Sequence, residues 1–408
     1  MPENYNNLHR IFTARHIGFK FRIHPTDADF KVLNEAKTKV RAYLKSKMKE
    51  YLESQGIQNI VPKFRVQGSW AYGTCNLPAR LGQEMDVDYG IYLPVSAFTS
   101  FNSKSQSTQA KDYFAQVEKF LKELCQSEEW KLDTSKSTCI RIKIKPNAHM
   151  DVPLYAVPDN MFDSLVERNT LMLATEAAKF DSATSNRVML NEWYIQDYQL
   201  SSIDFAEDSF ESLEDKNITT IHMAKRDGSW QSSDCEIIRE WFSNKLEMLP
   251  DNGKQLRSIC RYLKAWRDWI FESGSPSSIL LMIIACKHYS YNESRDDLAL
   301  ADVLEKLPET LAKDVYESIK EHENEDFNRM NPEEREYARK RADDLYNNFL
   351  SSLLSTDKEE IINYMEGQWG DRIPRDTGLI EISRKEDVFD TTPLVQSIIT
   401  SQTPLRQG

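Results

Sequence analysis

The longest regular pattern of apolar residues in this chain predicts one long helix near its beginning. Thr26 is suited to the N-cap position, and neither Pro nor Gly occurs between it and Gly56. Apolar residues recur every three or four positions as far as about Glu53, namely Phe30, Leu33, Ala36, Val40, Leu44 and Met48. Because this spacing places them on one side of a helix, we expect that side to be buried.

Alternation with a period of two predicts strands after this helix. Residues 64–67 have strand chemistry, 85–93 alternate up to Pro94, and 139–145 alternate between apolar and basic side chains. Residues 149–157 are expected to form the partner strand of 139–145 after a short turn. Between these strands, the Ser-, Gln- and Lys-rich residues 100–111 predict a loop and residues 113–125 predict a helix.

From about residue 234 onward the pattern becomes helical. Helices are expected over 235–246, 254–272 and 277–289, and Ser275-Pro276 has the chemistry of an N-cap followed by Pro at the first helical position. After about residue 384 the chain is polar and punctuated by Pro, which predicts a mobile tail that ends in Gly408. We therefore predict an α+β fold: a mixed lobe with a long N-terminal helix (1–230), a helical C-terminal lobe (231–384) and a flexible tail (385–408).

The charge balance changes the expected partners. The chain has 52 basic and 64 acidic residues, a formal net charge of −12. A protein that follows a long phosphate backbone usually has a basic surface, so we expect small anionic substrates and no stable nucleic-acid partner. The six cysteines form no CxxC pair or zinc-type cluster, and no apolar stretch is long enough for a membrane span. A cytoplasmic location is the expectation.

Three aspartates form the candidate chemical centre. Asp86 and Asp88 lie two residues apart on a predicted strand, so their carboxylates leave the same face, and Asp151 lies on another strand. Converging carboxylates suit Mg²⁺ or Mn²⁺. Upstream, Gly68-Ser69 follows a strand, where backbone amides and a hydroxyl can approach phosphate. Each signal taken singly also has a purely structural explanation. Asp86 and Asp88 fit a solvated strand face, Gly68-Ser69 fits an ordinary turn, and Asp151 fits a cap or a pair with a lysine. The joint order of these elements favours the metal and triphosphate arrangement of the polymerase-β-like nucleotidyltransferases.

Several longer motifs resemble one family in particular. They are Gln67-Gly-Ser-Trp-Ala-Tyr-Gly-Thr-Cys-Asn-Leu-Pro through Gly82-Gln-Glu-Met-Asp-Val-Asp-Tyr-Gly-Ile-Tyr-Leu-Pro94, then His149-Met-Asp-Val-Pro-Leu-Tyr-Ala-Val-Pro158, Trp230-Gln-Ser-Ser-Asp234, Lys264-Ala-Trp-Arg-Asp268 and Pro276-Ser-Ser-Ile279. In this order they are similar to the cGAS/DncV-like nucleotidyltransferases (CD-NTases), in the branch of bacterial cyclic GMP–AMP synthases. The resemblance covers roughly residues 20–290 and is weak afterwards.

The resemblance implies roles for individual residues. It implies that Asp86, Asp88 and Asp151 hold two Mg²⁺ ions, for which Mn²⁺ can substitute, and that Asp151 helps to deprotonate the attacking hydroxyl. It also implies nucleotide contacts from Gln67, Gly68, Ser69, Tyr72, Arg141, Ser233, Lys264 and Ser278. From the residues alone, Tyr72 fits a base-stacking or a core position. The basic stripe Arg257, Arg261 and Lys264 fits either a nucleotide-facing or a solvated helix face.

The function expected from the resemblance is synthesis of a cyclic dinucleotide from ATP and GTP or other nucleoside triphosphates. Cyclic GMP–AMP is the expected product, and another cyclic di- or trinucleotide is the alternative product. Pyrophosphate would be released, and the product would bind an effector in bacterial anti-phage (CBASS) defence. The alternatives are a nucleotidyltransferase that extends RNA ends or modifies a protein, and an inactive relative that only binds; the intact aspartates favour an enzyme. The resemblance also implies that an E1–E2-like enzyme conjugates the C-terminal Gly408 to a target.

Overall fold

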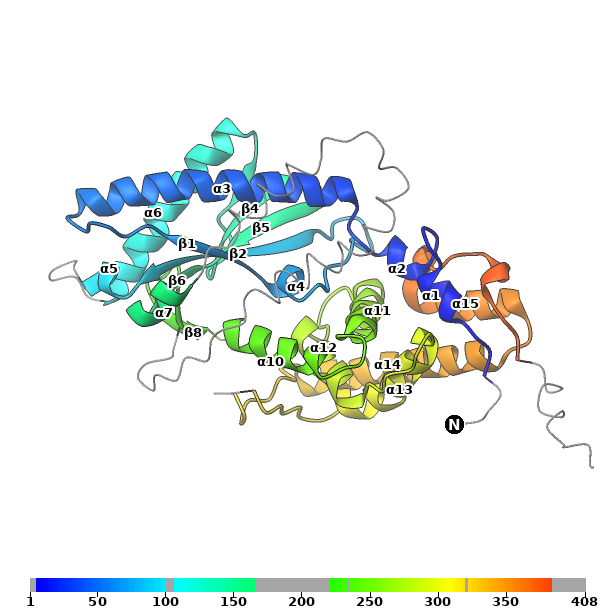
Figure 1. Ribbon diagram of the computed structural model, residues 1–408. Coiled ribbons are helices and arrows are strands. Elements are labelled where there is room, and N and C mark those ends of the chain that lie inside the picture. Colours follow the sequence, from blue (N-terminus) through cyan, green and yellow to red (C-terminus); the bar gives the residue numbers. More distant parts are fainter. Residues whose placement is uncertain (1–4, 100–105, 166–220, 234, 320–321, 384–408) are drawn as a thin grey trace, which may run out of the picture.

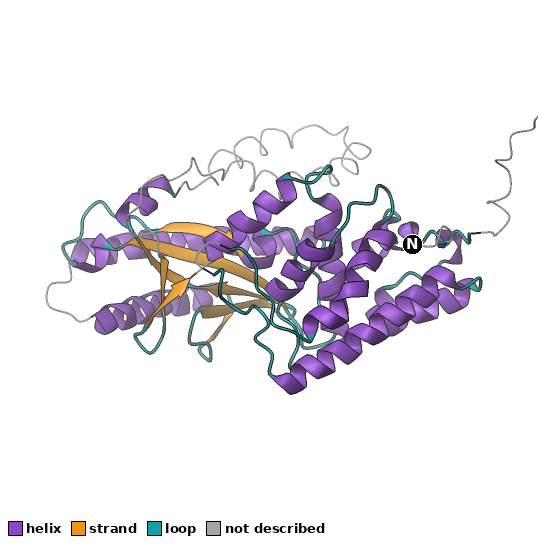
Figure 2. Ribbon diagram, turned by 90° about the horizontal axis from the view of Figure 1, so that it is seen from below, coloured by secondary structure: helices purple, strands orange, loops and turns teal. Residues whose placement is uncertain are grey.

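The computed structural model describes residues 5–99, 106–165, 221–233, 235–319 and 322–383. A mixed sheet with two long helices on one face forms one lobe, and a group of helices forms the other (Figures 1 and 2). Each lobe has its own large hydrophobic core. The α+β fold expected from the sequence is thereby confirmed.

Helix α3 (Asp27–Ser54) lies along the sheet and confirms the predicted long helix (Figure 1). It begins with a capping box, in which the Thr26 side chain accepts from the Asp29 backbone N–H and Asp29 accepts from the Thr26 N–H. Its predicted apolar side is buried, except that Phe30 is only partly buried. Helix α6 (Gln106–Ser127) packs on the same face of the sheet, and the two helices share one core with it.

Within the described residues the sheet has eight strands, with the order β3-β4-β5-β2-β6-β7-β8 and β1 paired to β2. Its strands are β1 (Lys63–Gln67), β2 (Met85–Pro94), β3 (Lys131–Asp133), β4 (Ile140–Lys145), β5 (Ala148–Val152), β6 (Leu154–Val157), β7 (Ile221–Ala224) and β8 (Trp230–Ser233). The ten-residue strand β2 is central, because it pairs in parallel with β5 and β6 and antiparallel with β1. Short helices α4 (Gly68–Ala71), α5 (Ser96–Thr99) and α7 (Asp159–Ser164) connect or follow the strands.

Two local expectations were wrong. The single strand expected over 149–157 is divided by Pro153 into β5 and β6, which pair with different parts of β2. Proline has no N–H for the ladder, so pairing stops there and resumes with the next residue. The loop expected over 100–111 is wrong from Gln106 onward, where α6 begins, whereas residues 100–105 lie outside the described residues. Ala110 is fully buried in the core shared with the sheet, and this packing outweighs the weak helical pattern of the segment.

The second lobe consists of helices that surround Trp266 and Trp369, both fully buried. Its elements are α10 (Cys235–Glu247), α11 (Lys254–Ile270), α12 (Ser278–His288), α13 (Asp296–Leu311), α14 (Pro332–Leu354), α15 (Lys358–Trp369) and the 3-10 turns η1 (Gly370–Arg372) and η2 (Thr377–Leu379). The three helices predicted over 235–289 are present. The cap of α12 is Ser277, which accepts from the Leu280 N–H, and not Ser275 as expected.

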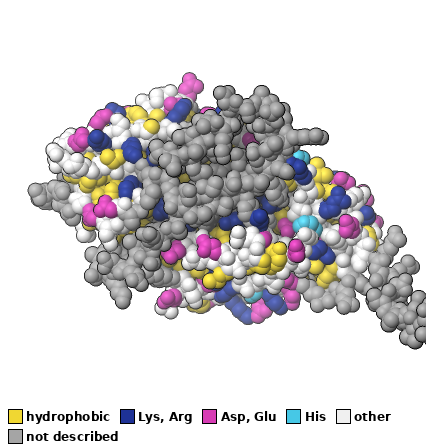
Figure 3. Space-filling model, in the orientation of Figure 1, with side chains coloured by type: hydrophobic (Ala, Val, Ile, Leu, Met, Phe, Trp, Pro, Cys, Tyr) yellow, Lys and Arg dark blue, Asp and Glu magenta, His cyan; other side chains and the backbone are white. Residues whose placement is uncertain are grey.

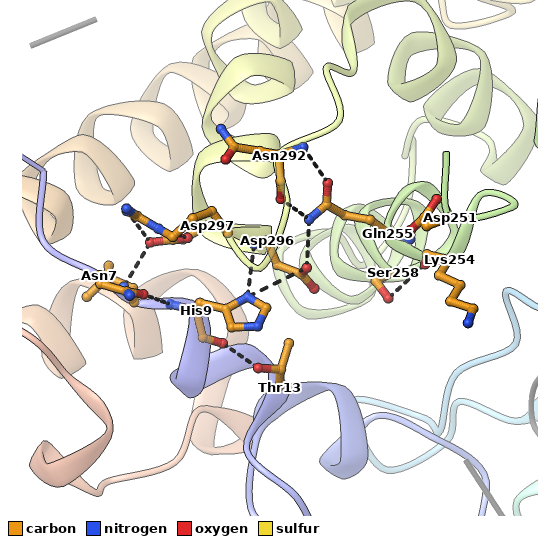
Figure 4. A network of polar contacts seen from close by, with 12 residues as sticks. Asn7, His9, Thr13, Asp251, Lys254, Gln255, Ser258, Asn292, Asp296 and Asp297 are labelled. Atoms are coloured by element: carbon orange, nitrogen blue, oxygen red, sulfur yellow. Dashed lines mark hydrogen bonds and ion pairs between the residues drawn. The ribbon is translucent and has the colours of Figure 1, made fainter. Parts of the chain in front are cut away.

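The N-terminal residues pack in this helical lobe and not against the sheet. Helices α1 (His9–Thr13) and α2 (Phe19–Arg22) contribute Phe12 and Phe19 to the core around Trp369. Polar contacts join the same segment to α11 and α13: the Asp296 N–H donates to His9 Nδ1, and Gln255 donates to the Asp296 carboxylate (Figure 4). The division into 1–230, 231–384 and 385–408 stays a prediction, but residues 8–23 belong to the core of the second lobe.

The described surface and helices bear on two expectations, about surface charge and about membrane spans. Among the described residues on the face shown in Figure 3, Lys and Arg side chains lie among Asp and Glu side chains and form no separate basic stripe. Among the described helices, none combines the length and apolar character that a membrane span requires.

Candidate active site

Neighbouring strands bring the predicted aspartates together. In β2, Met85, Val87 and Tyr89 face the core under α3 and α6, so the intervening Asp86 and Asp88 face the other side. The parallel register of β2 and β5 sets Asp86 beside His149 and Asp88 beside Asp151. Four polar side chains thus form a two-by-two array on one face of the sheet. Three of them, Asp86, His149 and Asp151, have ligand atoms within 4.8 Å of one another.

A cavity of about 450 Å³ lies between the two lobes, next to this array. From the sheet lobe it is lined by Asp86, Asp88 and residues of α4 and its flanks; from the helical lobe it is lined by α11 and α12. Eight predicted site residues line it: Gln67, Gly68, Ser69, Tyr72, Asp86, Asp88, Lys264 and Ser278. Asp151 and Arg141 are not among its lining residues.

The array is electrostatically suited to a cation. Burial, followed by repulsion from Asp86 and Asp151, raises the pKa of Asp88 to about 7. Buried Asp86 Oδ1 has no hydrogen bond of good geometry to any residue that the structure describes. Carboxylates brought together without enough donors are the donor set that hard divalent ions prefer, so these residues fit Mg²⁺ or Mn²⁺.

Arg141 lies at this centre, but it contacts Asp151 and does not line the cavity. The two residues are paired in the register of β4 and β5. The guanidinium donates from Nε and Nη2 to the two Asp151 oxygens, each over 2.7 Å. The Asp151 carboxylate in turn raises the pKa of Arg141. The nucleotide contact implied for Arg141 therefore requires this pair to rearrange, which the sequence did not indicate.

His149 and Glu84 are site residues that the sequence reasoning missed. Glu84 Oε2 is 2.7 Å from His149 Nδ1, and Lys143 Nζ donates to Glu84 Oε1 over 3.1 Å. Burial alone would lower the pKa of His149, but the adjacent Asp86 outweighs it and raises the pKa. The signal was available for His149, because period two places it on the same strand face as Asp151.

The Gly68-Ser69 segment is the start of α4 and not only a turn. Gly68 has a φ of +62°, and the Asp88 carboxylate lies where a Cβ of residue 68 would be. The side-chain amide of Gln67 lies behind this segment, where it donates to the Tyr92 hydroxyl and accepts from the Tyr155 hydroxyl over 2.9 Å. Gln67 thus lines the cavity and is also held by hydrogen bonds to two buried tyrosines.

Helix α11 supplies buried cations that contact the loop after α4. Lys264 Nζ donates to the Thr74 carbonyl over 2.6 Å, and Arg261 forms a reciprocal pair with Asn76 over 2.8 and 3.0 Å. Burial lowers the pKa of Lys264 from its ordinary value. The stripe Arg257, Arg261 and Lys264 is buried and not solvated, which corrects that alternative. Its partners on the sheet lobe could not be seen in the sequence.

The remaining predicted residues have varied positions. Tyr72 is a core residue that packs edge-on against Phe242 at 5.9 Å and also reaches the cavity. Ser278 accepts from Arg267 Nη1 over 2.6 Å at the start of α12, so Arg267 is a further lining residue that the sequence missed. Ser233 ends β8 opposite Ile221. Gly408 lies outside the described residues.

Comparisons with known proteins agree with this geometry. Residues 62–155 match the family "Cyclic GMP-AMP synthase DncV-like, nucleotidyltransferase domain", and residues 253–382 match "Cyclic GMP-AMP synthase, C-terminal domain". The chain is 29% identical over 342 residues to the cyclic GMP-AMP synthase of Vibrio cholerae serotype O1, covering 82% of this chain and 72% of the relative. It is 30% identical over 322 residues to a cyclic GMP-AMP synthase of Escherichia coli, covering 76% and 68%.

A solved structure has the same fold. It is the V. cholerae DncV cyclic AMP-GMP synthase in complex with the linear intermediate 5′ pppA(3′,5′)pG. The TM-score is 0.68 at 22% sequence identity, and the match covers 94% of this chain and 100% of the other. At this identity the likeness shows the fold.

Proposed function

This chain belongs to the DncV-like nucleotidyltransferases, and from that premise we propose that it joins ATP and GTP into cyclic GMP–AMP with release of pyrophosphate. The observation that carries the proposal is the array of Asp86, Asp88 and Asp151 beside the start of α4, at a cavity between the lobes. The relative from V. cholerae has been solved with a linear pppA(3′,5′)pG intermediate, which supports two successive transfers in one cavity.

The size and charge of the site support small substrates. A cavity of about 450 Å³ lies in the range of small-molecule sites, which is roughly 300–1,000 Å³. The net charge of −12 and the mixed charges on the face in Figure 3 do not favour a polymer that must be followed over many phosphates. These observations favour cyclisation over the extension of RNA ends.

In the proposed reaction a ribose hydroxyl of one nucleotide attacks the α-phosphate of the other, and pyrophosphate leaves. A second transfer between the ends of the linear intermediate closes the ring. Asp86, Asp88 and Asp151 would hold two Mg²⁺ ions, or Mn²⁺ in their place. When bound, such ions supply charge stabilisation at the attacking and leaving oxygens. The protein contributes mainly position, because phosphoryl chemistry needs few covalent steps from side chains.

The surrounding residues would orient the two nucleotides. Gly68 and Ser69 place backbone amides and a hydroxyl beside the aspartates, where a triphosphate can be bound. Lys264 and Ser278 approach the same cavity from the helical lobe and are suited to contact the second nucleotide. Tyr72 has a ring at the wall, and the Arg141 guanidinium would become available to phosphate once a cation shares Asp151. We also propose a nucleotide contact for Ser233, as the resemblance implies.

Incubation with ATP, GTP and Mg²⁺, followed by mass spectrometry and phosphatase treatment, tests this function. We expect a ring that resists phosphatase because it has no terminal phosphate. Asp86→Asn combined with Asp88→Asn should abolish pyrophosphate release in a folded protein. Asp343→Asn with Asp344→Asn, the same charge change on α14, should not. Growing linear chains that phosphatase degrades would instead favour the RNA-extending alternative, and no nucleotide product would favour the inactive, binding relative.

The cellular role rests on the resemblance and is proposed with the same function. The product would activate an effector in anti-phage (CBASS) defence in the cytoplasm, and an E1–E2-like enzyme would join Gly408 to a target. The polar, Pro-punctuated sequence of residues 385–408 supports an accessible tail. Co-expression with such an enzyme should give a covalent adduct that Gly408→Glu abolishes. Equal adducts from both proteins, or none from either, would refute conjugation at Gly408.

A further inference from the structure

One member of the two-by-two array, His149, has no role in the function described so far. It stands beside Asp86 in the register of β2 and β5, and two residues before Asp151 on the same strand. It is 5% exposed, although imidazole is polar and the opposite face of β5 is filled by apolar side chains. A buried polar ring next to a candidate metal site calls for a physical explanation.

The contacts of His149 form a short chain that leads to Asp86. Lys143 binds Glu84, Glu84 Oε2 lies 2.7 Å from His149 Nδ1, and His149 Nε2 lies 3.1 Å from Asp86 Oδ1. The second Asp of the array is farther away, since Nε2 is 4.0 Å from Asp151 Oδ1. The ring is therefore fixed at one nitrogen and presents the other to Asp86.

Glu84 and Asp86 are alternate residues of one segment, so His149 lies between two carboxylates on the same side of the sheet. Both side chains line the cavity, but that of Glu84 is only 17% exposed, whereas that of Asp86 is 47% exposed. The less exposed carboxylate, Glu84, therefore binds His149, and the more exposed one, Asp86, is open to a ligand in the cavity. This is the order found in metal sites where an outer residue orients the residue that binds the ion.

We propose that His149 is a positioning residue, which restricts the rotation of the Asp86 carboxylate for the divalent ion, and that Glu84 fixes the His149 ring. The inference rests on the proposed metal-dependent transfer. Without His149, the Asp86 carboxylate rotates more freely, and ordering it on binding costs entropy. Removal of such outer partners typically weakens metal binding by about 10–100-fold. Direct ligation by His149 Nε2 is the competing arrangement.

The test is a titration of the full-length protein with Mn²⁺, followed by electron paramagnetic resonance. His149→Gln should bind Mn²⁺ about 10–100-fold more weakly than the wild type. Saturating Mn²⁺ should recover most of its turnover, and the KM for ATP at that concentration should be nearly unchanged. His222→Gln, on β7 of the same sheet, is the matched control and should bind Mn²⁺ normally.

A second pair of variants keeps the test independent of any folding defect at the buried histidine. Glu84→Ala changes a residue that is less buried than His149 and should also weaken Mn²⁺ binding, whereas Glu84→Gln retains an acceptor for Nδ1 and should largely rescue it. Unchanged Mn²⁺ affinity in His149→Gln and Glu84→Ala would overturn the proposal. A directly coordinated ¹⁴N signal in the wild type would also overturn it, in favour of ligation. A wild type that binds Mn²⁺ but makes no cyclic product would refute the proposed function without touching this inference.

Discussion

Replacing Gly68 by alanine should separate catalysis from stability. The added Cβ would overlap Asp88 Oδ2 and lie 3.1 Å from its Cγ, so the carboxylate would have to retreat by about 1 Å or more. A misplacement of this size typically costs about 100-fold in rate. The backbone adds its own penalty, because a non-glycine residue at a φ of +62° is strained by about 1–2 kcal/mol.

Gly56→Ala is the matched control for this change. Gly56 has a φ of +82° just after α3, and a Cβ there would meet nothing within 4 Å. Both variants should therefore unfold at lower temperature than the wild type, and Gly68→Ala by at least as much as Gly56→Ala, because only its Cβ meets Asp88. Only Gly68→Ala should lose about 100-fold in pyrophosphate release at saturating nucleotide and Mg²⁺. Equal activity of the two variants would refute the reasoning, since it would mean that Asp88 tolerates the displacement.

Two further predictions follow from the contacts of the site. Asp88→Asn should abolish activity but raise the melting temperature of the metal-free protein. In the folded protein the pKa of Asp88 is about 7, above the ordinary aspartate value of 3.8. As the pH rises from 3.8 to about 7, ionisation of Asp88 therefore lowers the free energy of unfolding of the wild type. The gain in melting temperature should be larger at pH 8 than at pH 5. A wild type that melts at a higher temperature than Asp88→Asn at pH 8 would contradict this. Arg80→Met removes hydrogen bonds to the Trp269 and Phe271 carbonyls at the end of α11, and denaturant titration should show a loss of about 1–3 kcal/mol. Lys313→Met, which removes only an exposed ion pair, should lose less than about 1 kcal/mol, and equal losses would refute a role for Arg80 in joining the lobes.

Several side-chain contacts around the aspartates could not be predicted from the sequence. Arg141 alternates with apolar residues on a strand, but only the register of β4 against β5 places it opposite Asp151. Lys264 and Arg261 have the spacing of a basic helix face, and their partners Thr74 and Asn76 lie about 190 positions earlier. Pairings over such distances depend on how the lobes pack and leave no periodic trace in the chain.

The sequence by itself determined the features that depend on neighbouring residues. The start of α3 at Thr26, the alternation that places Asp86 and Asp88 on one strand face, and the helices after residue 234 all follow from local spacing. The tertiary structure alone decided which strands became neighbours, and therefore that His149 stands beside Asp86 and Arg141 on Asp151. It also decided that residues 8–23 join the helical core. The physical reason is that periodicity is set by backbone geometry within a few residues, whereas register and lobe packing are set by burial summed over segments far apart in the chain.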